Sequence, residues 1–410
     1  MVTGRQSLIY SLLDQLASAL SLFAFTAIVS RALAPEMFGY FTVLLAWVSL
    51  LGALLQPALI DSSTVLASRT KPGDPDWSRL ALQLSFGLML VASVAAVLFV
   101  LSVAPGLAVA LLLAIASEVM VSAMALLRRT SYVGGPAWMG ASLSSMSLVL
   151  TVCLLPAVMQ QTNFDGIQAA LLGRLLVNGF IALPACWLLI RGDRWHHWRA
   201  ALIGAKDLIQ FSRAYIGGSV IFWITNSLQV VLIGHALSMT EAAGYRAALL
   251  LTLPLGQLQA ALFQLMLPRT LKAVHAHQPL STSLVIKLCL IFGLPPMAYA
   301  VSLFWLAHPL LGLVFGPSYE VFEYVAVALA GLAIVDALKQ VAVILIYALD
   351  MKSLFMRYRL WALALFLCGV VPALWIGELM AFVVASGVGS VLLLIYLGWF
   401  LSRRLERGVA

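Results

Sequence analysis

The sequence predicts an all-α polytopic membrane protein with about 12 transmembrane helices. Hydrophobic residues make up 63% and charged residues only 10% of the 410-residue chain, whereas soluble domains carry roughly 25% charged residues. The hydrophobic residues form runs that are long enough to cross a bilayer as helices, which takes about 20 residues each. The runs are rich in Leu, Ala and Val and lack the period-2 alternation of outer-membrane barrel strands.

Twelve hydrophobic runs meet this length requirement, and no connection between them is long enough for a separate soluble domain. In chain order, the expected spans lie near residues 8–30, 38–60, 79–102, 106–127, 136–158, 166–190, 212–236, 243–267, 283–306, 320–348, 358–376 and 380–401. The first run is expected to be a retained helix. It carries Asp14 and Gln15, is longer than a signal-peptide core, and lacks a convincing cleavage site.

The positions of Lys and Arg predict the orientation. If the N-terminus is cytoplasmic, all basic residues except Arg31, Arg174, Arg246 and Lys339 fall at the cytoplasmic side. This is the asymmetry expected of a multi-pass protein whose positive loops stay inside. We therefore expect a multi-pass membrane protein with both termini in the cytoplasm. Topology accounts for the net charge of +8, so no nucleic-acid partner is expected.

The central stretch RGDRWHHWRAALIGAKDLIQFSR separates six spans from six. Its five basic residues and its Trp-His-His-Trp cluster are typical of an amphipathic segment at the lipid headgroups. Neighbouring histidines point about 100° apart on a helix, which disfavours a ligand pair. We expect an N-terminal lobe of residues 1–190, a cytoplasmic amphipathic linker of residues 191–211, and a C-terminal lobe of residues 212–410.

Metal and cofactor chemistry is not expected. All four cysteines lie inside hydrophobic spans without CxxC spacing, which disfavours disulfides and metal ligation. The chain also lacks a nucleotide-binding P-loop and an HExxH motif, so we do not expect an enzyme.

A short segment occurs twice. RALAPEMFGY at residues 31–40 and HALSMTEAAGY at residues 235–245 each join the first and second spans of a half. Because six spans separate them, the two copies enter the membrane in the same direction. Such repeats are expected to pack about a pseudo-two-fold axis along the membrane normal. Chance similarity between two short loops is the alternative.

The quoted segments extend into a family resemblance. Residues 11–59, SLLDQLASALSLFAFTAIVSRALAPEMFGYFTVLLAWVSLLGALLQPAL, resemble the first two helices of bacterial polysaccharide flippases. Residues 211–251, FSRAYIGGSVIFWITNSLQVVLIGHALSMTEAAGYRAALLL, resemble helices seven and eight of that family. These O-antigen and exopolysaccharide exporters belong to the multidrug/oligosaccharidyl-lipid/polysaccharide exporter superfamily, with the multidrug and toxic compound extrusion (MATE) transporters and the lipid II flippases.

The resemblance implies a function. Family members move undecaprenyl-diphosphate-linked oligosaccharides from the cytoplasmic to the periplasmic leaflet by alternating access of a central cavity. The implied partners are that lipid-linked substrate, the bilayer, and polysaccharide polymerase or export machinery. The alternatives are a MATE-type multidrug antiporter and, among enzymes, a membrane-embedded O-antigen polymerase or glycosyltransferase.

The polar residues inside the spans are the candidate site, because ionisable groups are costly there and are usually functional. Arg174, roughly 12 Å into its helix, shares a face with Asn178, and Lys339 is followed by Gln340. We expect these four to contact diphosphate and sugar. A snorkelling Arg174 and a self-neutralising pair of Lys339 with Asp336 are the alternatives.

The buried acids Asp14, Glu118 and Asp336 have two interpretations. Desolvation suits a carboxylate that binds and releases H⁺ or Na⁺ during transport. Each could equally be a static partner of a buried base, and the sequence does not pair them.

The outer ends of the repeated helices carry Arg31, Glu36, Glu241 and Arg246. Contacts among them across the lobes would form an outer gate. Helix capping and interfacial anchoring are the alternative explanations.

Overall fold

The computed structural model describes residues 4–56, 60, 108–133, 136–161, 164–191, 212, 216–275, 282–349 and 351–406. Within these residues the secondary structure is helical and contains no strand. Ten helices are long and apolar enough to cross a membrane, and a pair bent by 44°, Met239–Leu251 with Leu253–Leu271, brings the number to 11. The prediction of an all-α polytopic membrane protein is confirmed, and the expected span at 79–102 lies outside the described residues.

The contacts between residues divide the chain into two compact units, Met1–Trp223 and Ile224–Ala410. The boundary falls inside the span Ile216–Ala236. Apart from Arg191, the predicted linker lies outside the described residues, so the assignment of residues 191–211 as an amphipathic segment stays a prediction. The pseudo-two-fold axis stays a prediction as well.

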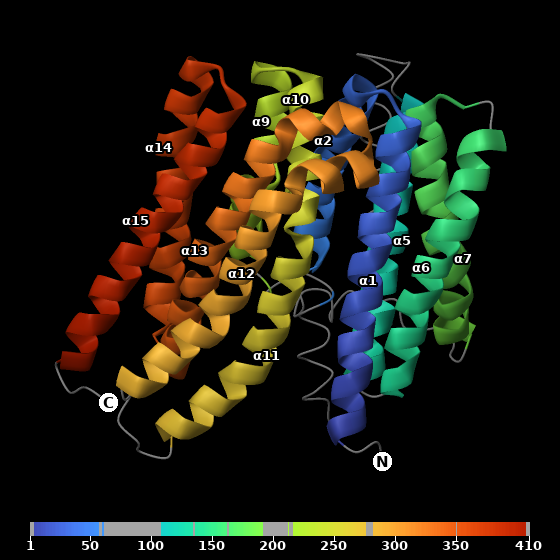
Figure 1. The fold of residues 1–410 in the computed structure, drawn as a ribbon. Coiled ribbons are helices and arrows are strands. Elements are labelled where there is room, and N and C mark those ends of the chain that lie inside the picture. Colours follow the sequence, from blue (N-terminus) through green and yellow to red (C-terminus); the bar gives the residue numbers. More distant parts are fainter. Residues whose placement is uncertain are drawn as a thin grey trace. The chain divides into compact units, whose positions relative to one another are not determined.

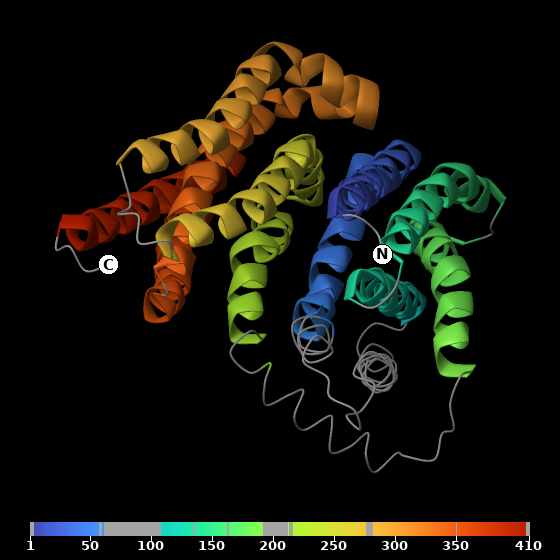
Figure 2. The same ribbon diagram turned by 90° about the horizontal axis from the view of Figure 1, so that it is seen from below.

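The first unit is a helical bundle organised around two helix pairs. Its helices are α1 (Gly4–Ala32), α2 (Pro35–Leu55), α5 (Ala108–Val133), α6 (Ala137–Gln161) and α7 (Gly166–Arg191). Helix α1 packs along α6, whereas α5 packs along α7 and also contacts α2. Figures 1 and 2 show these helices running side by side. Helix α5 therefore lies between α2 and α7, with access to side chains from both.

The second unit is arranged around α13 (Glu323–Ala348). Its other elements are α9 (Leu228–Ala236), α10 (Met239–Leu251), α11 (Leu253–His275), α12 (Thr282–Phe315), the 3-10 helix η4 (Pro317–Phe322), α14 (Lys352–Ile376) and α15 (Leu379–Glu406). Helices α11, α12 and α15 all pack against α13, and α14 packs against α15. The unit can be followed from yellow to red in Figure 1.

The repeated segment forms a tight joint between two helices in each half. Pro35 is the first residue of α2, where its missing N–H costs nothing, and Glu36 lies in the first turn. In the second copy, the Glu241 backbone N–H donates to the Ser238 hydroxyl over 3.1 Å, which caps α10. Both acids therefore occupy helix N-termini, where a negative charge is favourable.

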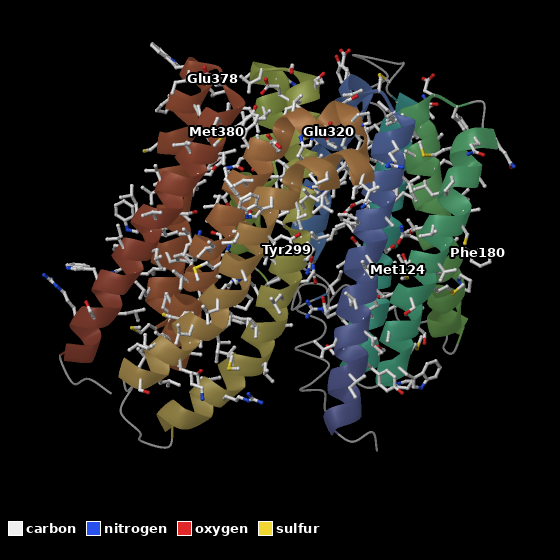
Figure 3. All side chains as sticks on the ribbon, viewed as in Figure 1. Met124, Phe180, Tyr299, Glu320, Glu378 and Met380 are labelled. Atoms are coloured by element: carbon white, nitrogen blue, oxygen red, sulfur yellow. The ribbon has the colours of Figure 1, made fainter. Side chains whose placement is uncertain are left out.

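Large apolar side chains cover the outside of the helices. Phe180 is 64%, Trp305 74% and Trp375 91% exposed, and Figure 3 shows Phe180 projecting from α7 away from its bundle. A soluble monomer rarely exposes a large contiguous apolar surface. In a bilayer, these side chains contact lipid.

The repeated glycine in the second copy is required by packing. A Cβ atom at Gly244 would collide with the ring of Phe322, which belongs to η4. We predict that Gly244→Val lowers the thermal unfolding midpoint of the purified protein, because overpacking a core costs about 1–3 kcal/mol. The matched control is Gly256→Ala, where a Cβ has no neighbour within 4 Å. An unchanged midpoint for Gly244→Val would show that α10 and η4 do not pack in this way.

Candidate functional site

Arg174 is held inside the first unit by an acid and a hydroxyl from α5. Its Nη2 atom donates to Glu118 Oε2 over 2.9 Å, and its Nη1 atom donates to Ser117 Oγ over 3.2 Å. The two side chains are 15% and 12% exposed. Because adjacent residues of α5 supply both acceptors, the guanidinium lies against that helix and is neutralised there. Arg174 is thus paired rather than snorkelling freely.

Asn178 shares the face of Arg174, as its spacing of four residues predicts. Its Nδ2 atom donates to the Arg174 backbone oxygen over 2.8 Å. This bond is internal to α7 and fixes the amide against the backbone of that helix.

Asp14 of α1 is paired with Arg128 of α5. Its Oδ1 atom lies 2.7 Å from Arg128 Nε, and Arg128 Nη2 donates to its Oδ2 atom over 3.0 Å. Ser18 and Ser144 complete the cluster, with the Ser144 hydroxyl donating to Asp14 and Arg128 Nη1 donating to Ser18 Oγ. The carboxylate is only 2% exposed. The Asp14 carboxylate is thus held by the Arg128 guanidinium of α5 and the Ser144 hydroxyl of α6.

The assignment of Arg128 to the cytoplasmic side stays a prediction, but the helix that carries Arg128 is longer than expected. The predicted helix ended near residue 127, whereas α5 continues to Val133 and carries Arg128 inside it. Hydrophobicity falls at the two consecutive arginines, which is why the apolar run appeared to end there. The signal that could have identified Arg128 is the presence of a deep aspartate that needs a cation.

A row of hydroxyl groups continues from Asp14 along the contact between α1 and α6. Ser21 Oγ lies 3.1 Å from both Ser147 Oγ and Thr151 Oγ1. All three residues are buried. Such bonds fix the packing of two transmembrane helices, so this row has a structural role.

Lys339 is neutralised within its own helix in the second unit. Its Nζ atom lies 2.5 Å from Asp336 Oδ1 and donates to Ser390 Oγ of α15 over 3.0 Å. Lys339 is 15% exposed, whereas Asp336 is 46% exposed. The half-exposed acid is thus the accessible member of the pair. Gln340 follows on α13 and is partly buried.

A buried polar network lies on α15 one helical turn from Ser390. The Tyr245 hydroxyl donates to Gln229 Oε1 over 2.5 Å, and Gln229 Nε2 donates to Ser386 Oγ. Ser386 and Ser390 are four residues apart and so share a face of α15. This face binds α9 through Gln229 and α13 through Lys339, which fixes Lys339 within the unit.

Three of the four candidate gate residues lie in the terminal turns of helices, and Arg246 lies in the middle of α10. Arg31 is in the last turn of α1, and Arg31 and Glu36 are exposed. Glu241 and Arg246 are partly buried in α10. The positions of Glu36 and Glu241 in first turns agree with capping, and the gate across the lobes stays a prediction.

The three ion pairs limit what the site can do chemically. Each buried base named above is already neutralised by an acid, so an anionic ligand must displace a carboxylate to bind there. The described residues contain no group of three His, Cys, Asp or Glu side chains that could hold a metal ion. An exchange of one anion for another at Arg174 or Lys339 is the chemistry that this arrangement supports.

Known proteins match the chain in sequence pattern and in fold. A family model described as polysaccharide biosynthesis protein matches residues 28–324. No curated protein sequence matches the chain.

Among solved structures, an inward-facing multidrug resistance MATE family transporter of the MOP superfamily has a TM-score of 0.73 at 16% identity over 96% of both chains. The lipid II flippase MurJ, in an inward closed conformation, has a TM-score of 0.73 at 12% identity over 96% of this chain and 87% of its own. A MOP superfamily transporter from Pyrococcus furiosus has a TM-score of 0.62 at 13% identity over 98% and 96%. These likenesses establish the fold.

The Asp14–Arg128 pair gives a prediction about stability. Asp14→Asn leaves a buried guanidinium without a counter-charge, and breaking such a pair costs about 3–5 kcal/mol. We expect a clear drop in the thermal unfolding midpoint, part of which the double variant Asp14→Asn with Arg128→Gln recovers. The control is Ser142→Ala on α6, where Ser142 is exposed. Equal midpoints for Asp14→Asn and this control would rule out a structural role for the pair.

Proposed function

The chain belongs to the family of polysaccharide biosynthesis proteins, and from this premise we propose that it flips undecaprenyl-diphosphate-linked oligosaccharide across the bacterial inner membrane. The lipid-linked sugar enters from the cytoplasmic leaflet and leaves in the periplasmic leaflet as the protein alternates its access. The proposal keeps both termini in the cytoplasm and six helices in each lobe. A polysaccharide polymerase or export complex then takes the product.

The single observation that carries the proposal is the neutralised arginine within the bundle. The Arg174 guanidinium faces one carboxylate oxygen of Glu118 at 2.9 Å and one hydroxyl of Ser117 at 3.2 Å. A phosphate offers the same acceptor geometry with more oxygens, and guanidinium binds it in a bidentate manner. A diphosphate can therefore replace Glu118 without leaving Arg174 unpaired in a low dielectric.

The displaced carboxylate supplies a mechanism for coupling. An ionised Glu118 without its cation is costly in the membrane interior, so it takes up H⁺ or Na⁺ while the substrate is bound. Release of the substrate returns Arg174 to Glu118 and expels the ion. Asp14 differs, because Arg128, Ser18 and Ser144 surround it; a structural role fits it better than ion coupling.

The pair in the second unit is proposed as the second contact. Lys339 keeps its bond to Ser390 while phosphate replaces Asp336, whose side chain is 46% exposed and free to turn away. Asn178 and Gln340 lie beside Arg174 and Lys339 and hydrogen-bond sugar oxygens. Lys339 is thus proposed to add to substrate binding by the same exchange of anions.

Multidrug export is the second candidate function, favoured by the likeness to a multidrug resistance MATE transporter. A cationic drug would pair with Glu118 or Asp336 rather than with the bases. Replacing the bases would then leave drug export intact, whereas it impairs glycan export. The enzyme alternative has less support, because the structural neighbours are transporters and a flippase.

Charge removal tests the site directly. We predict that Arg174→Gln and Lys339→Gln each lower glycan export by at least about tenfold, equivalent to about 1.4 kcal/mol of lost substrate stabilisation. Surface glycan is measured in a flippase-null strain and normalised to the amount of protein in the membrane. Arg129→Gln, at an exposed position of α5, is the control and should export normally. Full complementation by both variants would exclude Arg174 and Lys339 as substrate contacts.

Ion coupling gives a separate prediction. If Glu118 takes up a proton when phosphate binds Arg174 and releases it with the substrate, export in inverted vesicles should rise when the outer, cytoplasmic face is made acidic relative to the lumen. Glu118→Gln stays neutral and should lose this dependence, because the side chain no longer titrates. A gradient dependence that survives in Glu118→Gln would move the coupling group elsewhere, and the same experiment on Asp336→Asn tests the other lobe.

A further inference from the structure

The Glu118 carboxylate touches more than Arg174. Its Oε2 atom accepts from Arg174, while its Oε1 atom faces the backbone of α2 at Gly52. A Cβ atom added at Gly52 would lie 2.5 Å from Glu118 Oε1 and 3.6 Å from its Cδ atom. No side chain other than hydrogen fits there while Glu118 keeps its place. The carboxylate is therefore enclosed between α7 and α2.

A larger residue at position 52 would push the Glu118 carboxylate aside. Such a shift usually costs little free energy when the displaced atoms are the end of a flexible side chain. Here the flexible end is fixed, because the same carboxylate is bound to Arg174 over 2.9 Å. Glu118 cannot move away from α2 without lengthening that bond. The position of α2 and the strength of the Glu118–Arg174 pair are thus linked through one residue.

The same stretch of α2 is bonded on a second side. The Trp223 indole Nε1 donates to the Ala46 backbone oxygen over 2.9 Å and to Ser49 Oγ over 3.0 Å. The Trp223 ring also packs against Trp47, with centroids 5.8 Å apart. Trp223 is the last residue of the first unit. Residues 46–52 of α2 therefore contact the ion pair at Gly52 and the span Ile216–Ala236 at Ala46 and Ser49.

We infer that Gly52 is a positioning residue, which seats the Glu118 carboxylate against α2 and so makes α2 respond when an anionic substrate takes Arg174. The inference rests on the proposed function for its last step. When phosphate displaces Glu118, the carboxylate loses its cation and leaves its seat at Gly52. The α2 backbone at Gly52 then loses its contact with the Glu118 carboxylate, and α2 shifts. The hydrogen bonds from Trp223 to α2 transmit this shift to the span Ile216–Ala236.

A double-mutant cycle tests the seat. Gly52→Ala is expected to lower export at least about fivefold, the lower range of measured couplings between sites. Glu118→Asp shortens the acid by one methylene and makes room for the new methyl group. In a Glu118→Asp background, the Gly52→Ala change should therefore alter export by less than about twofold, because only residues in contact couple in this way. Gly179→Ala is the control, since its Cβ meets neighbours only at 3.9 Å or beyond.

The outcomes are separable. Normal export by Gly52→Ala would overturn the inference. An equal loss of export when Gly52→Ala is made in the wild-type chain and in Glu118→Asp would also overturn it, because the change would then disturb only the packing of α2. If Gly52→Ala does not accumulate in membranes, Glu118→Asp should restore its level, and failure to do so also overturns the inference.

The same double-mutant cycle can be measured without transport, from the thermal unfolding midpoints of the purified variants. If Arg174→Gln exports normally while the unfolding midpoints still show coupling between Gly52 and Glu118, the proposed function is rejected and the positioning role of Gly52 is kept. Reduced export by Arg174→Gln with no coupling between Gly52 and Glu118 would do the reverse.

Discussion

The cost of an ionised group in hydrocarbon is the constraint on which this molecule depends. A charged side chain at the centre of a bilayer costs at least about 2.5–3.5 kcal/mol. Asp14, Glu118 and Lys339 meet that cost with counter-charges at 3.0 Å or less. The Asp14 and Glu118 contacts also join separate helices, because the acid lies on one helix and the base on another.

The two units meet this constraint differently. In the first unit, both pairs join separate helices: Asp14 of α1 binds Arg128, and Arg174 of α7 binds Glu118. Since α5 contributes one member of each pair, it is the electrostatic centre of that bundle. In the second unit, Asp336 and Lys339 pair within α13, and only the Ser390 hydroxyl comes from another helix.

This difference bears on transport. A pair that bridges helices rearranges the bundle when it opens, whereas a pair within one helix opens by a rotation of side chains. In the proposed mechanism, exchange at Arg174 is the step suited to moving α2, through Glu118 and Gly52, while exchange at Lys339 adds affinity with little motion. In this proposal the Asp14 cluster, with two hydroxyls and Arg128, holds α1 in place while the neighbouring helices respond.

The sequence by itself determined the fold class, because the length and composition of each hydrophobic run are local properties. They decide whether that run can cross a bilayer as a helix. It also identified the deep charges, since any charge within such a run is conspicuous, and the family resemblance in residues 11–59 pointed to the polysaccharide family. It could not pair those charges: Arg128 seemed to lie beyond the end of its helix, and Glu118 had Arg174 and Lys339 as equal choices. Only the tertiary structure decided the pairs, the role of Gly52 beside Glu118, and the fit of Gly244 against Phe322. Each of these depends on which helices touch, and a distance between residues tens of positions apart in the chain is set by packing rather than by local sequence.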